Sequence, residues 1–374
     1  MKKLILPVML CLGISAFAQE EETSWTDGFT LSGSIDAYFR QNITTLNKVT
    51  DQGYPAPGSS FANQPGFALG MANAILSYEK GNVGAVADLV YGPRGTDAVF
   101  ASTTASSSIV NQLYVYWNVS ESVTLTFGNW NTYLGYEVIS PAANFNYSTS
   151  YMFSYGPFSH SGLKADFALD DNWSAMLAVM NATDFTDFNP SGSYTFGGQL
   201  GYSTDSGSTF LNLLYGDQDG DYTDQGMGEG VGSTFQVDLT TGYDLSDSFY
   251  LGLNATYNTT EAGDLADDYG FYGVALYAQA ALSDSFSLGL RPEYFSQFGT
   301  GINDFDAIGG SDAEGDANVF AVTLSGNAKV GPLTIIPEFR LDSASEDVFL
   351  DSYDGTPTFT GSLGSFLLAA VYSF

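Results

Sequence analysis

FTLSGSIDAYFR, residues 29–40, alternates apolar and polar side chains along its length. Successive side chains of a β-strand point to opposite faces of the sheet, so this alternation gives one apolar and one polar face. The apolar face carries Phe29, Leu31, Ile35, Ala37 and Phe39, and the polar face carries Thr30, Ser32, Ser34, Asp36, Tyr38 and Arg40. Strands with this pattern are typical of a transmembrane barrel with lipid outside and water inside.

Fifteen further segments have a similar length, and most of them alternate in the same way. The alternation is weakest in residues 66–78, where Ala and Gly occupy both faces. With residues 29–40, the segments predict an all-β, antiparallel, up-and-down barrel. They are residues 66–78, 83–91, 109–118, 123–130, 162–169, 173–180, 194–202, 209–216, 234–243, 249–258, 271–282, 286–294, 318–328, 333–341 and 363–374.

The connections between the segments predict the number of strands independently of the alternation pattern. Eight are long and irregular, and seven are short and rich in turn-forming residues. In bacterial barrels the short turns face the periplasm and the long loops face outward. Seven turns with both chain termini in the periplasm predict 16 strands. Merging or splitting one pair of strands would give 14 or 18. A barrel of this size encloses an aqueous lumen. The turns are residues 79–82, 118–122, 170–172, 205–207, 244–247, 283–284 and 329–332.

The composition of the chain excludes several other classes. The 374 residues include 10 Lys and Arg against 42 Asp and Glu, and 15% are aromatic. A disordered acidic chain would be poor in aromatic residues, and a helical protein would show helical periodicity. The negative charge also disfavours nucleic acid as a partner. We therefore expect a barrel in the cell outer membrane, in contact with its lipid and glycolipid.

The N-terminus predicts export. Residues 1–18 combine two lysines, an apolar run and the small-x-small sequence AFA at residues 16–18, as in a secretory signal peptide. Cys11 lies inside this peptide, so the mature chain has no cysteine for a disulfide or a thiolate site. Residues 19–374 are predicted to form one barrel domain without a helical anchor.

The C-terminal segment ends on an aromatic residue. Phe366, Leu368, Ala370 and Tyr372 alternate up to Phe374. This pattern resembles the closing strand that the barrel assembly machinery recognises in bacterial outer-membrane proteins. An edge strand that happens to end in Phe would look the same. We expect Phe374 to contact the assembly machinery.

The longest connection, residues 131–159, contains a single charged residue, Glu137. A loop so long and apolar would be poorly stabilised in water. We predict that it folds into the lumen, with Glu137 facing the narrowest point or bonded to Arg40 or Arg291. The aromatic side chains expected to pack against the wall are Tyr133, Tyr136, Phe145, Tyr147 and Phe153.

Short motifs in this loop resemble a known family. GYE at residues 135–137, NFNYSTS at 144–150 and GPFSHSG at 156–162 are similar to the motifs of the Putative beta-barrel porin-2 (OmpL-like) family. Ser159 stands where the family pattern has Thr, and Thr149 stands where it has a basic residue. The resemblance implies an outer-membrane porin of Bacteroidota. The matching motif residues are Gly135, Tyr136, Glu137, Pro157, Phe158, His160 and Gly162.

The alternation also predicts which charged side chains point into the lumen. A basic residue facing lipid near the membrane midplane costs roughly 2 to 4 kcal/mol, so this register is strongly favoured. Together with Glu137, these residues are the candidates for lining a pore. They are Asp36, Arg40, Asp88, Lys164, Asp166, Asp238, Arg291, Glu293, Glu338 and Arg340.

Residue types that support catalysis or metal binding are scarce. His160 is the only histidine, and Gly162 occupies the position where a phospholipase barrel would have serine. We interpret His160 as structural and predict neither an enzyme nor a zinc site. The acids at 217, 219 and 221 have the spacing of a calcium loop, but the loop lacks the usual Gly and Glu. The weak calcium candidates are Asp217, Asp219, Asp221 and Asp224, and no other cofactor is expected.

The predicted function is passive diffusion of small hydrophilic solutes and ions through an outer-membrane porin. Residues 217–232, 259–270, 295–316 and 342–362 carry 19 acids and no Lys or Arg, which predicts a mild cation preference. The alternative is a surface-exposed binding or structural barrel, an adhesin or envelope scaffold with a plugged lumen. The sequence leaves open both alternatives and a homo-oligomer.

Overall fold

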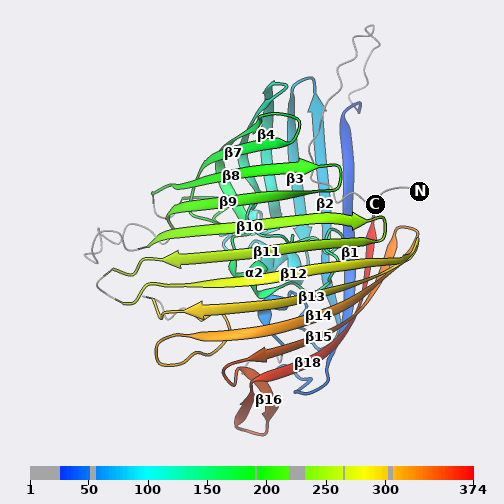
Figure 1. Ribbon diagram of the computed structural model, residues 1–374, viewed down its shortest axis with the longest axis vertical. Coiled ribbons are helices and arrows are strands. Elements are labelled where there is room, and N and C mark those ends of the chain that lie inside the picture. Colours follow the sequence, from blue (N-terminus) through cyan, green and yellow to red (C-terminus); the bar gives the residue numbers. More distant parts are fainter. Residues whose placement is uncertain (1–25, 51–55, 190–191, 219–231, 264–265, 302–305) are drawn as a thin grey trace.

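Sixteen strands form a closed antiparallel barrel in the computed structural model, and β1 closes against β18 (Figure 1). The structure describes residues 26–50, 56–189, 192–218, 232–263, 266–301 and 306–374. The barrel and its 16 strands confirm the prediction from the turns. The predicted signal peptide, residues 1–18, lies outside the described residues.

The barrel strands are joined in chain order, and all seven predicted turns connect neighbouring strands. Most strands extend a few residues beyond the predicted ends. Their bounds are β1 (Phe29–Asn42), β2 (Gly66–Lys80), β3 (Val83–Tyr91), β4 (Val110–Ser120), β5 (Val123–Asn131), β6 (Ser159–Ala168), β7 (Trp173–Met180), β8 (Thr195–Thr204), β9 (Gly207–Asp217), β10 (Ser233–Ser246), β11 (Phe249–Thr260), β12 (Tyr269–Ser283), β13 (Phe286–Phe298), β14 (Ala317–Val330), β15 (Leu333–Ala344) and β18 (Ser362–Ser373).

Several long loops contain short regular elements that the sequence patterns did not predict. The last loop, expected to be irregular, forms a separate two-stranded sheet outside the barrel. The elements are η1 (Gly58–Ser60), α1 (Pro93–Ala98), η2 (Ser107–Ile109), α2 (Tyr151–Tyr155), β16 (Phe349–Tyr353) and β17 (Pro357–Thr360). Within the described residues, no helix has the length and apolar content needed to cross a bilayer.

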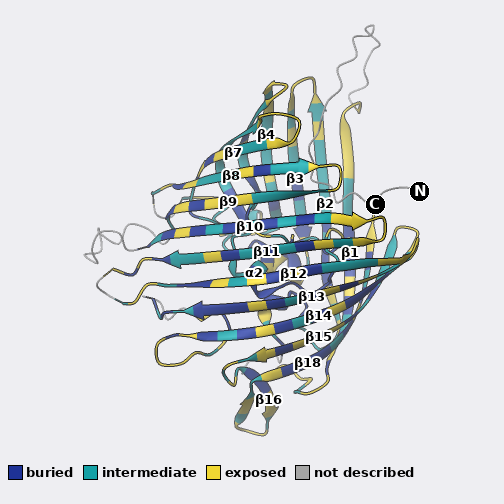
Figure 2. Ribbon diagram, in the orientation of Figure 1, coloured by how far each residue is buried: buried dark blue, intermediate teal, exposed yellow. Residues whose placement is uncertain are grey.

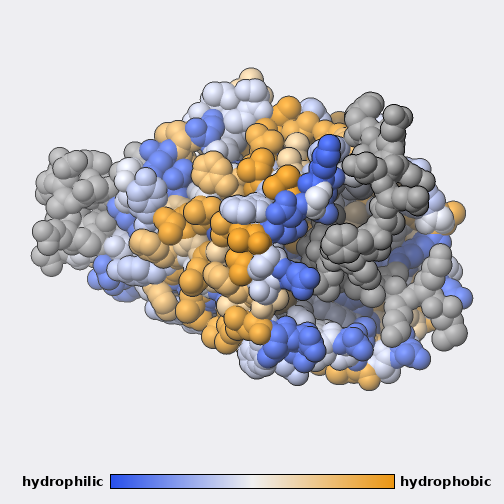
Figure 3. Space-filling model, turned by 90° about the horizontal axis from the view of Figure 1, so that it is seen from above, coloured by the Kyte–Doolittle hydropathy of each residue, from blue (hydrophilic) through white to orange (hydrophobic). Residues whose placement is uncertain are grey.

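The two faces of the wall differ as the alternation predicts. In β1, Asp36, Tyr38 and Arg40 are buried inside the barrel, whereas Leu31 and Ile35 are more than half exposed on the outside. Figure 2 shows this change between buried and exposed residues along the strands. Hydrophobic side chains gather over the middle of the outer face seen in Figure 3. This surface suits the hydrocarbon interior of a membrane.

Candidate functional site: a loop anchored in the barrel lumen

The connection between β5 and β6, residues 132–158, lies inside the barrel and is called the lumen loop below. Its α2 helix is seen among the barrel strands in Figure 1. The loop is closed at its base, where the Thr132 N–H donates to the Phe158 carbonyl at 2.9 Å. Asp184, in the next long loop, accepts the N–H groups of Phe158 and Ser159 at 2.7 and 3.0 Å. Burial raises the pKa of Asp184 to about 7, although both N–H groups oppose this shift.

Carboxylates of the wall hold the backbone N–H groups of the lumen loop. Glu338 accepts the N–H groups of Tyr147 and Ser148 at 2.8 and 3.2 Å. Glu293 accepts the first two N–H groups of α2 at 3.0 and 2.9 Å. The first N–H groups of a helix have no partner within the helix, so Glu293 satisfies two of them. Wall carboxylates therefore position the middle of the loop.

Arginines hold the carbonyl groups of the same segment. The carbonyls of three successive loop residues, 147 to 149, accept from Arg94, Arg291 and Arg340 at 3.0, 2.7 and 2.7 Å. Arg94 also donates to the Ile139 carbonyl at 2.8 Å. The three guanidinium groups come from α1, β13 and β15, so the loop backbone is bonded both to the wall and to another loop.

Glu137 is bonded to its surroundings rather than free in the lumen. It forms an ion pair with Arg291, and both side chains are almost completely buried. Its second carboxylate oxygen accepts the Ser150 N–H at 2.8 Å. Ser150 in turn caps α2 by accepting the Phe153 N–H at 3.0 Å. Of the roles predicted for Glu137, the contacts show the anchoring bond to Arg291.

Glycines on the inner wall leave room for side chains of the lumen loop. A Cβ atom added at Gly289 would lie 2.0 Å from the Phe145 ring, and one at Gly197 would lie 2.5 Å from the Tyr133 hydroxyl. Such separations are far below normal contact distances, so any larger residue would displace the ring. The other wall glycines of this kind are Gly70 at Tyr147, Gly252 at Tyr136 and Gly273 at Met152.

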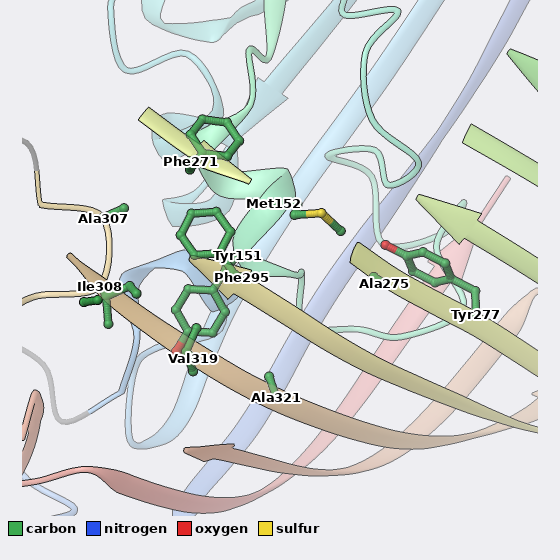
Figure 4. Packing of buried hydrophobic residues seen from close by; sticks show 11 residues of the cluster. Tyr151, Met152, Phe271, Ala275, Tyr277, Phe295, Ala307, Ile308, Val319 and Ala321 are labelled. Atoms are coloured by element: carbon green, nitrogen blue, oxygen red, sulfur yellow. The ribbon is translucent and has the colours of Figure 1, made fainter. Parts of the chain in front are cut away.

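Aromatic contacts complete the packing of the lumen loop. Tyr136 stacks on Tyr277 with ring centroids 3.9 Å apart. Figure 4 shows Tyr151 beside Phe295 in the largest buried cluster, where the centroids are 5.8 Å apart. Phe153, also predicted to pack on the wall, packs against a buried cluster that includes Met71 of β2 and Val90 of β3. Its ring also contacts the rings of Phe61 and Phe158, with centroids 5.6 and 5.1 Å apart.

The structure places the charged residues predicted for the lumen on the inner face of the wall. Most are buried and bonded to protein groups. Lys164 and Asp166 form an ion pair with each other at 2.7 Å, and their side chains are 22% and 39% exposed. The buried residues are Asp36, Arg40, Asp88, Asp238, Arg291, Glu293, Glu338 and Arg340.

The remaining buried wall charges have two kinds of partner. Asp88 is bonded only to amides of neighbouring wall strands, including Asn111 and Gln112 at 2.6 and 3.2 Å. Asp238 accepts the Gly135 N–H of the lumen loop at 2.9 Å. Arg40, predicted to point into the lumen, is buried and donates to a carbonyl of the first long loop. Asp238 and Arg40 therefore hold loop backbone, whereas Asp88 links neighbouring wall strands.

Two functional residues were missed by the sequence patterns. Arg94 lies in a long loop without alternation, and only its isolated positive charge distinguishes it there. Asp342 was counted among the acids of the last loop, but it lies in β15, fully buried, and pairs with Arg340 at 2.9 Å. The strand continues beyond its predicted end, so Asp342 faces inward with Arg340, two residues away.

A family model described as Putative beta-barrel porin-2, OmpL-like, matches residues 28–374. The chain belongs to this family. The match confirms the resemblance predicted from the loop motifs. No curated protein sequence matches the chain.

Several solved structures share the fold of this porin. The outer membrane channel DcaP of Acinetobacter baumannii has a TM-score of 0.58 and 13% identity, with 92% of this chain and 97% of that chain covered. The anion-selective porin from Comamonas acidovorans has a TM-score of 0.57 and 13% identity, with 92% and 99% covered. OmpT of Vibrio cholerae in a trimer form has a TM-score of 0.54 and 11% identity, with 92% and 99% covered. This chain is therefore an outer-membrane barrel with a porin-like fold.

His160 of the porin lies in β6, paired with Trp130, and not in the loop. Its side chain is fully buried, and Nε2 lies 2.9 Å from the Thr132 hydroxyl. The imidazole ring is next to Tyr133, with centroids 5.1 Å apart. This position joins the beginning of the lumen loop to the strand where the loop ends, which suits a structural histidine.

The calcium candidates are only partly covered by the structure. Asp217 ends β9, whereas Asp219, Asp221 and Asp224 lie outside the described residues. In the described part of the chain, no three His, Cys, Asp or Glu side chains are placed to hold a metal ion. Calcium binding in this loop stays a prediction.

Replacing Arg291 by methionine is expected to destabilise the folded porin by about 3–5 kcal/mol, because Glu137 would remain buried without its partner. The temperature at which the barrel unfolds on a detergent gel measures the change. The double substitution R291M/E137L should recover a large part of the loss, since no unpaired charge remains. A double variant as unstable as R291M would contradict this account.

Proposed function

We propose that this porin allows passive diffusion of small hydrophilic solutes and ions across the outer membrane, with the lumen loop narrowing the channel. The supporting observation is that the loop is anchored on the wall while four of its residues stay exposed. The four residues are uncharged and are Gly135, Val138, Ala142 and Ala143. Where uncharged residues like these line a channel, they restrict solutes by size more than by specific bonds. Membership in a porin family also supports a channel rather than an enzyme.

Single-channel recording tests the proposal directly. The purified porin in a planar bilayer should give stepwise openings in molar salt. Silence at high protein load, with the barrel shown to be folded on a detergent gel, would contradict it. That result would favour the structural or binding barrel with a plugged lumen.

A mild cation preference is the second part of the proposal. Among the described residues, seven carboxyl groups and four guanidinium groups are buried. The interior therefore has more acidic than basic groups. The acidic outer loops add negative charge at the mouth, although Asp342 does not contribute there. Such charges attract cations most strongly in dilute salt, because the Debye length is about 8 Å at physiological salt and longer below it.

Reversal potentials under a KCl gradient measure this preference. We expect cation preference in dilute salt and a weaker preference in molar salt. Neutralising the acids of two outer loops should reduce it, whereas neutralising acids of the periplasmic turns should have less effect. Anion preference, or a preference unchanged by the first set, would contradict the proposal. The first set is Asp217, Asp219, Asp221, Asp224, Asp304, Asp306, Asp312, Glu314 and Asp316, and the second is Asp170, Asp171, Asp205, Asp244, Asp247 and Asp284.

Assembly and origin belong to the same proposal. OmpT of Vibrio cholerae has been solved in a trimer form, which supports a homo-oligomer for this porin. The Phe374 side chain is half exposed at the end of β18, as recognition by the assembly machinery would require. An origin in Bacteroidota is implied by the loop motifs alone.

A further inference from the structure

An apolar groove of about 500 Å³ lies on the lipid-facing side of β2 to β6. Ala85 lines it at an outward position of β3, where a small side chain leaves the surface low, and the Gly84 backbone lies next to it. Val115, Phe127 and Leu163 form its sides, and all three are about half exposed or more on the outer face. The volume lies within the range of small-ligand sites, about 300–1,000 Å³.

The periplasmic end of this groove has a different character. Lys80 is exposed at the end of β2, directly before the periplasmic turn to β3. Tyr78 and Trp117 lie beside it on the outer face and are 36% and 48% exposed. Tyr and Trp are enriched at membrane interfaces, so this end lies at the level of the lipid headgroups of the inner leaflet.

Lys80 is the basic residue that lines this groove, and the other basic residues of the described chain lie in other places. All four arginines are buried inside the barrel, where they contact loop carbonyls. Lys164 pairs with Asp166 in the lumen, Lys48 lies in an outer loop, and Lys329 lies in β14, next to its last residue. None of the ion pairs among the described residues involves Lys80.

We propose that this groove binds one anionic phospholipid from the inner leaflet of the outer membrane. The phosphate contacts the Lys80 ammonium group, and one acyl chain lies over Gly84 and Ala85 towards Phe127. A single positive charge at headgroup depth, followed by an apolar channel towards the membrane centre, matches the charge and shape of such a lipid. The net charge of the chain is −32, so anionic lipid is repelled by the protein as a whole and attracted at this place.

Trp117 and Trp173 allow a matched fluorescence test. Both lie on the outer face near periplasmic turns and are 48% and 43% exposed, but only Trp117 lines the groove. One reporter porin carries Trp25→Phe and Trp173→Phe, and the other carries Trp25→Phe and Trp117→Phe. Both keep the buried Trp130 as a common background. The probe is phosphatidylglycerol with brominated acyl chains, which quenches tryptophan on contact, in phosphatidylcholine vesicles.

The quenching of Trp117 should show that brominated phosphatidylglycerol is enriched about fivefold beside this residue, relative to brominated phosphatidylcholine. This factor corresponds to the attraction of about 1 kcal/mol between one lysine and an anionic lipid. Trp173 should show no such enrichment. Lys80→Gln should remove the enrichment at Trp117, whereas Lys329→Gln should leave it. Ala85→Leu should fill the groove and reduce the enrichment, with Ala175→Leu on β7 as the control at an outward position outside the groove.

Two results would overturn the proposal. Equal lipid preference at both tryptophans would show that the groove has no lipid site. Protection of Trp117 from both brominated lipids in an oligomer would show that a second copy of the chain covers the groove. Neither result depends on whether the barrel conducts ions, so the lipid site and the proposed channel fail separately.

Discussion

Replacing Glu293 and Glu338 together by glutamine is expected to free the lumen loop and raise the single-channel conductance severalfold. These carboxylates accept four backbone N–H groups of residues 147 to 152. Hydrogen bonds to charged groups are stronger than neutral ones by roughly 1 kcal/mol each, so four weakened bonds release much of the anchoring energy. The double substitution also removes two negative charges that lie near the positive charges of Arg291 and Arg340. Conductance and its fluctuation between levels are the measured quantities.

Asp88→Asn is the matched control for this variant. Asp88 is a buried wall carboxylate as well, but its partners are wall amides and not loop groups. It should leave the conductance of the porin close to that of the wild type. If the E293Q/E338Q barrel is folded and conducts no more than the Asp88 variant, the carboxylates do not hold the loop in the channel.

Replacing Gly289 by alanine is expected to displace Phe145 and with it the adjacent part of the lumen loop. The new Cβ would lie 2.0 and 2.1 Å from two carbons of the Phe145 ring. The wall strand is hydrogen-bonded on both sides and cannot move away, so the ring must leave its position. Overpacking of this kind costs about 1–3 kcal/mol. We expect a lower unfolding temperature and a changed conductance.

Phe145→Ala should rescue the Gly289→Ala porin, because the ring that collides is removed. The coupling between the two substitutions in a double-mutant cycle measures the contact itself. Gly198→Ala serves as the control, since its added Cβ would have no heavy atom nearer than 4.0 Å. Additive effects of the Gly289 and Phe145 substitutions would show that the glycine does not serve to accommodate the ring.

The strands and turns of this porin could be predicted from local patterns. Two-residue alternation between lipid and water is a property of each strand alone, and short turns are recognised by their Gly, Asn and Asp residues. This is why the turn at residues 79–82 and the closing strand, predicted as residues 363–374 and observed as Ser362–Ser373, were found without the fold. Ends of strands were less well predicted, and Asp342 was assigned to a loop for this reason.

The sequence by itself therefore determined the barrel, its strand number and the family that its loop motifs indicated. Only the tertiary structure decided which groups meet inside. The bond from Arg340 to residue 149 and the bonds from Glu338 to residues 147 and 148 join positions about 190 residues apart. Gly289 likewise has no local signal that Phe145 lies against it. Such contacts depend on barrel closure, which brings strands from both ends of the chain around one loop, and no local pattern carries that information.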